Sequence, residues 1–206
     1  PFEMNNLALN PNYSSVLTEL RNELKTWMIS SKDMGLIPEP ILEELGREYG
    51  SKYNILRSED NRHLVRDLLQ IIESGESRVE KNIEGGLQSP HPAIRYWAVK
   101  AVGNHQLKKF LPKVMGLLND KNGSVRVSAA ESLAQLGDVT KASKYLAKEV
   151  NHENLLVGLY AIRAIESVGK GSKVHTQNAI LDAFKSDYEF TRRVSKRLVN
   201  EWGLSD

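Results

Sequence analysis

A run of small and apolar residues recurs about every 32 residues in the second half of this chain, and this repeat limits the possible folds more than any other feature. Its copies begin at Ile94, Val125, Val157 and Thr191, so successive starts lie 31, 32 and 34 residues apart. In the second copy, apolar residues follow Val125 at offsets of 4, 5, 8 and 11, which places them on one stripe of an α-helix. Gly137 closes this copy where many helices end in a left-handed residue. A unit this short cannot bury its apolar face alone, so neighbouring units must stack.

Each copy is followed by a second amphipathic segment, which predicts a helix pair in every unit. The clearest of these segments is residues 107–120, LKKFLPKVMGLLND, with Pro112 in its first turn, where a missing N–H costs little. The residues expected on its apolar face are Leu107, Leu111, Val114, Met115 and Leu118. A weaker unit begins near residue 61 with HLVRDLLQIIESG and VEKNIEGGL. The sequence predicts an all-α fold: an α-solenoid of about four to five helix pairs over residues 59–206, preceded by a short helical segment over residues 1–58.

The second copy contains a recognisable motif. Its residues are Val125, Arg126, Ala129, Ala130, Leu133, Leu136 and Gly137. This pattern resembles the HEAT repeat in its bacterial, PBS-lyase-like form. Arg95 and Arg192 occupy the arginine position in the first and fourth copies, whereas the third copy has Gly158 there. The resemblance implies a scaffold with HEAT-like helix pairs and an extended surface for binding a partner.

The first 58 residues predict two helices separated by a break. Asn10 followed by Pro11 is typical of a helix start. One apolar face of this first helix comprises Val16, Leu17, Leu20, Leu24, Trp27 and Met28. Residues 32–35, KDMG, interrupt it, and Pro38 and Pro40 introduce a second helix that ends at Gly50. The residues expected on the inner face of the second helix are Ile41, Leu42, Leu45 and Tyr49.

Two stretches in this part, PFEMNNLA at residues 1–8 and SKDMGLIPE at residues 31–39, resemble the closing segment of bacterial sulfatases of the alkaline-phosphatase superfamily, of the arylsulfatase and heparan-sulfatase kind. Asn10 and Lys32 stand where those proteins have Asp and Arg. The resemblance implies the C-terminal region of a sulfuric ester hydrolase, in which the repeats follow a catalytic domain of the same polypeptide. It also implies a periplasmic or secreted parent that uses calcium and a formylglycine residue. We expect Phe2, Met4 and Leu7 to be poorly anchored or to pack on a neighbour outside this chain.

No catalytic, cofactor-binding or metal-binding residue can be assigned in this chain. It has no cysteine, which excludes disulfides, thiolate metal sites and a thiol nucleophile. Ser89 lies in SPHPAIR, but the sulfatase motif requires Pro two and Arg four positions after the modified residue, and this spacing fails. The pairs Gly85–Gly86 and Gly169–Gly171 are interpreted as turns between helices. The histidines, which lack metal-site spacing and are expected mostly in exposed loops, are His63, His91, His105, His152 and His175. We therefore expect no hydrolase activity from the chain alone.

Charge is distributed unevenly along the chain. Residues 1–88 carry 10 Lys and Arg against 15 Asp and Glu, a balance of −5, whereas residues 89–206 carry 18 against 11, a balance of +7. A candidate polyanion-binding ridge comprises Lys108, Lys109, Lys113, Lys141, Lys144, Lys148, Arg192, Arg193, Lys196 and Arg197. The alternative interpretation is a set of solvated helix faces. No run reaches the ~18 apolar residues of a membrane helix, so no membrane partner is predicted.

Three functions remain open at this level. The first is the non-catalytic C-terminal region of a sulfatase, which packs on the catalytic domain and helps to bind a sulfated glycan. The second is an independent HEAT-repeat scaffold for protein–protein interaction. The third is nucleic-acid binding, ranked last because no base-reading or stacking residues accompany the basic ones.

Overall fold

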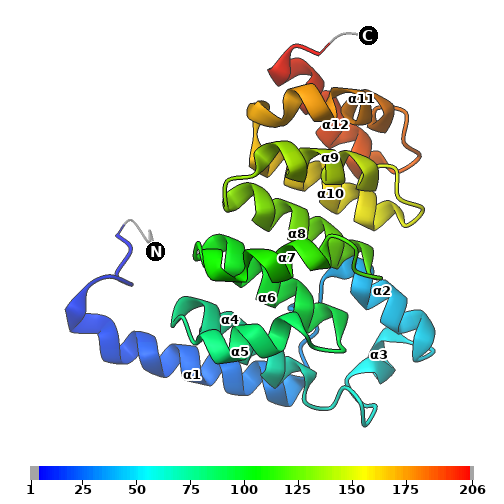
Figure 1. Cartoon of the computed structure of the whole chain (residues 1–206). Coiled ribbons are helices and arrows are strands. Elements are labelled where there is room, and N and C mark those ends of the chain that lie inside the picture. The colour runs from blue at the N-terminus through cyan, green and yellow to red at the C-terminus, as the bar shows by residue number, and fades with distance from the viewer. Residues whose placement is uncertain (1–4, 205–206) are drawn as a thin grey trace.

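The computed structural model describes residues 5–204, and this part of the chain consists of helices joined by short turns, without β-strands (Figure 1). In chain order, the elements are η1 (Pro11–Tyr13), α1 (Ser14–Ser31), α2 (Glu39–Glu48), α3 (Lys52–Ile55), α4 (Leu64–Glu76), α5 (Glu80–Leu87), α6 (Pro92–Asn104), η2 (Lys108–Phe110), α7 (Leu111–Leu117), α8 (Gly123–Gln135), α9 (Val139–Glu149), α10 (Leu155–Val168), η3 (Lys170–Ser172), α11 (Lys173–Ala183) and α12 (Glu189–Trp202). The all-α solenoid predicted from the repeats is confirmed. Phe2 and Met4 lie outside the described residues.

The helices from α4 onward stack in two layers (Figure 1). Layer A consists of α4, α6, α8, α10 and α12, each packed on the next, and layer B consists of α5, α7, α9 and α11. In Figure 1, α1 runs along the base of the stack beneath α4 and α5, and α12 lies at the opposite end. The two layers alternate along the chain, as a series of helix pairs requires.

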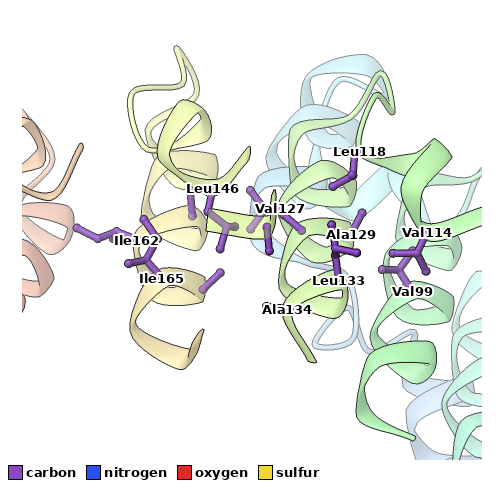
Figure 2. Packing of buried hydrophobic residues seen from close by; sticks show 14 of the residues in the cluster. Val99, Val114, Leu118, Val127, Ala129, Leu133, Ala134, Leu146, Ile162 and Ile165 are labelled. Carbon is purple, nitrogen blue, oxygen red and sulfur yellow. The ribbon is translucent and has the colours of Figure 1, made fainter. Parts of the chain in front are cut away.

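A continuous apolar core lies between the layers. Figure 2 shows Val99, Leu133 and Ile162 of layer A facing Val114 and Leu146 of layer B. Each such side chain stabilises the fold by about 1.5–3 kcal/mol relative to full exposure. Small residues of the repeat copies are fully buried: Ala98, Ala129, Ala130 and Ala161. The apolar stripe read from the repeat is therefore the surface on which neighbouring units stack.

The arginine of the repeat motif closes the loop that precedes it. Nη1 of Arg95, Arg126 and Arg192 donates to the carbonyl oxygen six residues earlier, at 2.8, 2.9 and 2.5 Å. Arg95 also forms a two-bond ion pair with Asp120, at 2.7 and 2.8 Å, and Arg126 pairs with Glu149 in the same way, at 2.6 and 2.8 Å. The hydrogen bond to Glu149 raises the pKa of Arg126. Arg95 and Arg126 thus tie the start of a layer A helix both to the loop before it and to the end of the layer B helix that follows, whereas Arg192 has only the loop contact. We call these three residues the clamp arginines.

Gly158 takes the clamp position in the third unit for a steric reason. A Cβ on this residue would lie 2.5 Å from the carbonyl oxygen of Val150, at the end of α9. No side chain fits there without movement of backbone, so glycine at this position permits the close approach of the start of α10 to the end of α9. The departure from the motif is thus a packing feature.

Residues 28–69 form a second core with the start of α6. Lys32 ends α1 in the left-handed conformation, with φ of 56°, and the chain then turns back so that Ile37 and Ile41 are buried. They pack in one cluster with Leu68 of α4 and Ala93 of α6. The predicted boundary between residues 58 and 59 stays a prediction, and this core spans it. The short helix α3 was not predicted.

Some local predictions are wrong. Gly85 and Gly86 lie inside α5, where a Cβ on Gly86 would meet Ile71 and Ala98 at 2.7 and 2.9 Å. This glycine therefore permits helix contact instead of forming a turn. Residues 107–120 form a 3-10 turn followed by the short helix α7, and Met115 is exposed instead of lying on the buried face.

The expectation for the histidines also needs correction. Of the five, His63 alone is exposed, and the others are partly buried. Nδ1 of His91 accepts the backbone N–H of Ala93 at the start of α6, and Nδ1 of His152 accepts that of Asn154. His91 thus caps the start of α6 and His152 the turn that leads into α10, roles that sequence spacing does not reveal.

Candidate binding surfaces

The structure divides the predicted basic ridge between the two layers. Its first six lysines lie on η2, α7 and α9, all in layer B. Lys109 and Lys113 form ion pairs with Glu80 and Glu84 of α5, which reduces their net charge. The lysines of α9 form no ion pair with any of residues 5–204: Lys141, Lys144 and Lys148. Polyanion binding by this ridge stays a prediction.

The four basic residues of α12 belong to layer A. Arg192 is the clamp arginine of the last unit, with its Nη1 on the carbonyl oxygen of Ser186. Arg193 pairs with Glu189 one turn earlier on α12, and Lys196 is exposed. Arg197 reaches across to Glu166 of α10. The structure therefore places the lysines of α7 and α9 in layer B and the α12 group in layer A.

A groove of about 670 Å³ crosses the exposed face of layer A and was not predicted from the sequence. One row of its lining residues directly follows the clamp position in each unit: Tyr96, Val127, Leu159 and Arg193. A second row lies four residues further along each helix: Lys100, Glu131, Arg163 and Arg197. Residues four apart share a helix face, so the two rows run in parallel across α6, α8, α10 and α12. The signal that could have revealed this layer A groove is the set of equivalent positions next to the motif arginine.

The charges of the layer A groove are unevenly compensated. Lys100 and Glu131 form a largely buried ion pair at 2.8 Å, which leaves little net charge at that end. At the other end, Glu166 is bound by Arg197 and lies 3.6 Å from Nε of Arg163. Two arginines thus share one carboxylate, and the side chain of Arg163 remains 62% exposed. The α10–α12 end of the groove is accordingly positive.

The chain's own residues 36–39 cover the part of layer A that lies next to the groove. Nε1 of Trp97 donates to the carbonyl oxygen of Leu36 at 2.7 Å, and the backbone N–H of Glu39 donates to Oη of Tyr160 at 3.2 Å. Ile37, between them, is 4% exposed. Burial raises the pKa of Tyr160, so this phenol stays protonated at neutral pH. Tyr160 also lines the layer A groove, so the covered surface and the open groove adjoin there.

Helix α1 exposes an apolar stripe. It holds the stack by an ion pair from Lys25 to Glu73 of α4 and by the partly buried Met28. None of its residues is buried. The stripe, with exposed fractions from 45% to 62%, begins at the last residue of η1 and consists of Tyr13, Val16, Leu20, Leu24 and Trp27. Leu7, ahead of the helix, is also exposed. Most of the apolar face predicted for this helix therefore lacks a partner among residues 5–204.

An acidic cleft lies where α2 meets the starts of α6 and α8. The carboxylate of Glu44 accepts from the side-chain amides of Asn122 and Asn154, at 2.7 and 3.3 Å, which ties α2 to two successive units. Beside it, burial and then the positive charge of Arg95 lower the pKa of His91 to about 4. A neutral His91 keeps Nδ1 free to cap α6. The polar residues of this cleft thus have a structural role, which is to join α2 to the stack and to cap α6.

Within residues 5–204, no group of three or more His, Asp or Glu side chains is arranged to hold a metal ion. The calcium and the formylglycine that the sulfatase resemblance implies belong to the expected catalytic domain, and they stay predictions. None of the helices in the described range is long and apolar enough to cross a bilayer.

Comparison with known families addresses the repeats directly. Residues 79–166, from the loop before α5 into α10, match the family model of HEAT repeats. This stretch contains the clamp residues Arg95 and Arg126 and their units. The match supports the HEAT-repeat resemblance for the centre of the stack. Among curated proteins, no match to the chain was found.

Proposed function

We propose that this chain is the non-catalytic C-terminal region of a sulfatase, in which α1 packs against the catalytic domain and the HEAT repeats extend away from it. The observation that carries the proposal is the apolar stripe on α1. Fully burying an apolar side chain is worth about 1.5–3 kcal/mol. Covering the exposed half of five such side chains would therefore contribute on the order of 5 kcal/mol before the costs of association. A patch of this kind on a soluble protein usually marks an interface.

The two sequence motifs support a catalytic domain as the covering partner. The first motif, residues 1–8, directly precedes η1 and α1. The second, residues 31–39, contains the left-handed break at Lys32 and the segment that lies on Trp97 and Tyr160. Both resemblances thus flank the helix whose face is uncovered. The positive balance of residues 89–206 suits a parent that acts on a sulfated glycan, which the lysines of α9 could help to hold.

The reading frame upstream of Pro1 provides the first test. The proposal expects a sulfatase domain there. This domain should contain the motif in which formylglycine forms: Cys or Ser, followed by Pro two positions later and Arg four positions later. An unrelated domain, or a start codon shortly before Pro1, would contradict it. Activity provides the second test: the longer polypeptide should hydrolyse an aryl sulfate, and the 206-residue chain should not. Turnover by the short chain would show that the repeats are not merely accessory.

An independent protein-binding scaffold is the second candidate, and the layer A groove favours it. This function needs no catalytic parent, because the groove and its charges are complete within residues 5–204. A stable complex of the short chain with one protein, lost on substitution in the groove and not on substitution in α1, would favour this candidate.

A further inference from the structure

We propose that the layer A groove binds an extended, acidic polypeptide segment that carries an apolar side chain, next to the place where the chain's own residues 36–39 lie. This inference does not depend on the identity of any parent protein. It rests on three features: the way layer A holds residues 36–39, the apolar floor of the groove, and the arginines at its far end.

Residues 36–39 show how layer A binds an extended segment. The indole N–H of Trp97 donates to one backbone carbonyl, and Oη of Tyr160 accepts one backbone N–H. Ile37, between these two contacts, is buried, and Glu39 follows it. Both hydrogen bonds go to backbone atoms, so they do not depend on the side chains of the bound segment. Tyr160, whose oxygen accepts from Glu39, also lines the groove, and its hydroxyl donates no hydrogen bond within residues 5–204, so it could donate to the backbone of a second segment.

The open groove offers an apolar floor for such a segment. Val127 and Val194 are buried beneath it, Leu159 is partly buried, and Phe190 is 52% exposed at its edge. These side chains come from α8, α10 and α12, so the floor spans about two repeat steps. An apolar side chain placed there would cover Phe190 and displace water from the floor.

The charge of the groove selects an acidic segment. Beyond the floor, Arg163 and Arg197 share the single carboxylate of Glu166, and Arg193 is paired only along its own helix, with Glu189. An Asp or Glu of the bound segment could pair with Arg163 without breaking an existing hydrogen bond, because this guanidinium donates none within residues 5–204. Glu39 follows the buried Ile37 in the bound segment, and the same order of apolar and acidic residues fits the groove.

A sulfated glycan or a nucleic acid fits this groove less well. Either would need a continuous row of cations, whereas Lys100 at one end is neutralised by Glu131. The lysines of α9, which form no ion pair within residues 5–204, lie in layer B and do not line the groove. The buried floor of Val127 and Val194 has no counterpart in a sulfated sugar.

The test uses the full 206-residue chain and a fluorescein-labelled octapeptide in which two central leucines are flanked by aspartates and glutamates. Binding is followed by fluorescence anisotropy. We expect Arg163→Glu combined with Arg193→Glu to weaken binding about tenfold, since both arginines are exposed and reversal turns attraction into repulsion. Phe190→Ala, which truncates an exposed side chain, should weaken it about threefold. The matched control, Lys144→Glu combined with Lys148→Glu on α9, makes the same charge change outside the groove and should leave binding within about twofold.

Thermal unfolding of each variant by circular dichroism checks that the fold persists. The proposal is overturned if the peptide fails to bind at millimolar concentration, or if the α9 control weakens binding as much as the groove variant does. It is also overturned if a peptide with glutamine and asparagine in place of the acids binds equally well. A heparin-derived hexasaccharide or a DNA oligonucleotide that binds the groove while the octapeptide does not would show a polyanion site instead.

Discussion

Arg95 provides the most direct test of how much the clamp arginines stabilise the fold. Its guanidinium makes two hydrogen bonds to the Asp120 carboxylate and donates to the carbonyl oxygens of Ser89 and Pro90, both at 2.8 Å. The two charged side chains are only 8% and 6% exposed. Arg95→Ala would leave Asp120 as a buried charge without its partner. Breaking a buried pair in this way costs about 3–5 kcal/mol, a large part of the about 5–15 kcal/mol that stabilises a typical domain.

Urea unfolding followed by far-ultraviolet circular dichroism measures this cost. The control is Arg193→Ala, which breaks an exposed pair between residues four apart on α12 and should cost about 0.3–0.5 kcal/mol. A further variant, Arg95→Met combined with Asp120→Asn, leaves no unpaired charge and keeps an acceptor for the N–H of Asn122, so it should recover part of the loss. Equal costs for Arg95→Ala and Arg193→Ala, or no recovery in the double variant, would refute the reasoning.

Three further predictions concern other parts of the fold. Burial holds the pKa of His91 at about 4, below its ordinary 6.5, so between these values the unfolded chain binds a proton that the folded chain does not. As pH drops from about 7.5 to 4.5, the free energy of unfolding should therefore fall by about 2–3 kcal/mol more in the native chain than in the His91→Asn variant, which keeps an acceptor for the cap. The same dependence of this free energy on pH in both proteins would contradict the prediction. Gly158→Ala should destabilise the fold by about 1–3 kcal/mol because of the contact with a backbone oxygen, whereas Gly116→Ala, with open space around it, should stabilise the fold by about 0.5–1 kcal/mol. Urea unfolding measures both changes. Stability changes of the same sign for the two variants would contradict the prediction. Leu24→Gln on the α1 stripe should change the melting temperature of the isolated chain little, whereas Leu68→Gln in the second core should unfold the chain, as seen by circular dichroism. A comparable loss of stability in both variants would show that the stripe on α1 is buried.

The stacking surface could be predicted from the sequence because the residues that form it are spaced by one helical turn within single helices. Ala129 and Leu133 lie one helical turn apart in the second repeat, and both are buried as the stripe predicts. The glycines after the repeats could be predicted for the same reason: Gly137 and Gly169 have φ of 115° and 87°, which other residues rarely adopt. Local spacing is sufficient wherever the partner is the equivalent residue of the next unit.

The layer A groove could not be predicted from any single segment. Its rows join residues about 32 positions apart, such as Lys100 and Glu131, which meet only after the units have stacked. The charge of α12 was visible in the sequence, and the copy that begins at Thr191 places it on the first helix of its unit, but the sequence alone does not show that Arg197 binds Glu166. Position within a repeat, compared across repeats, carries this information better than charge along the chain.

The apolar face of α1 was predicted correctly as a face but not as an uncovered one. The pattern of Val16, Leu20 and Leu24 indicates amphipathicity, and amphipathicity does not identify the partner. Only the packed structure shows that α4 takes the side of α1 with Met28 and leaves the stripe open.

The most direct test of the proposed function is amide hydrogen exchange in α1, measured by mass spectrometry in the 206-residue chain and in the longer polypeptide encoded by the upstream reading frame. The account predicts that residues 14–31 exchange at least about tenfold more slowly in the longer polypeptide, because a catalytic domain covers the stripe, while α9 and α11 remain unchanged. Identical exchange of α1 in both proteins would contradict the account.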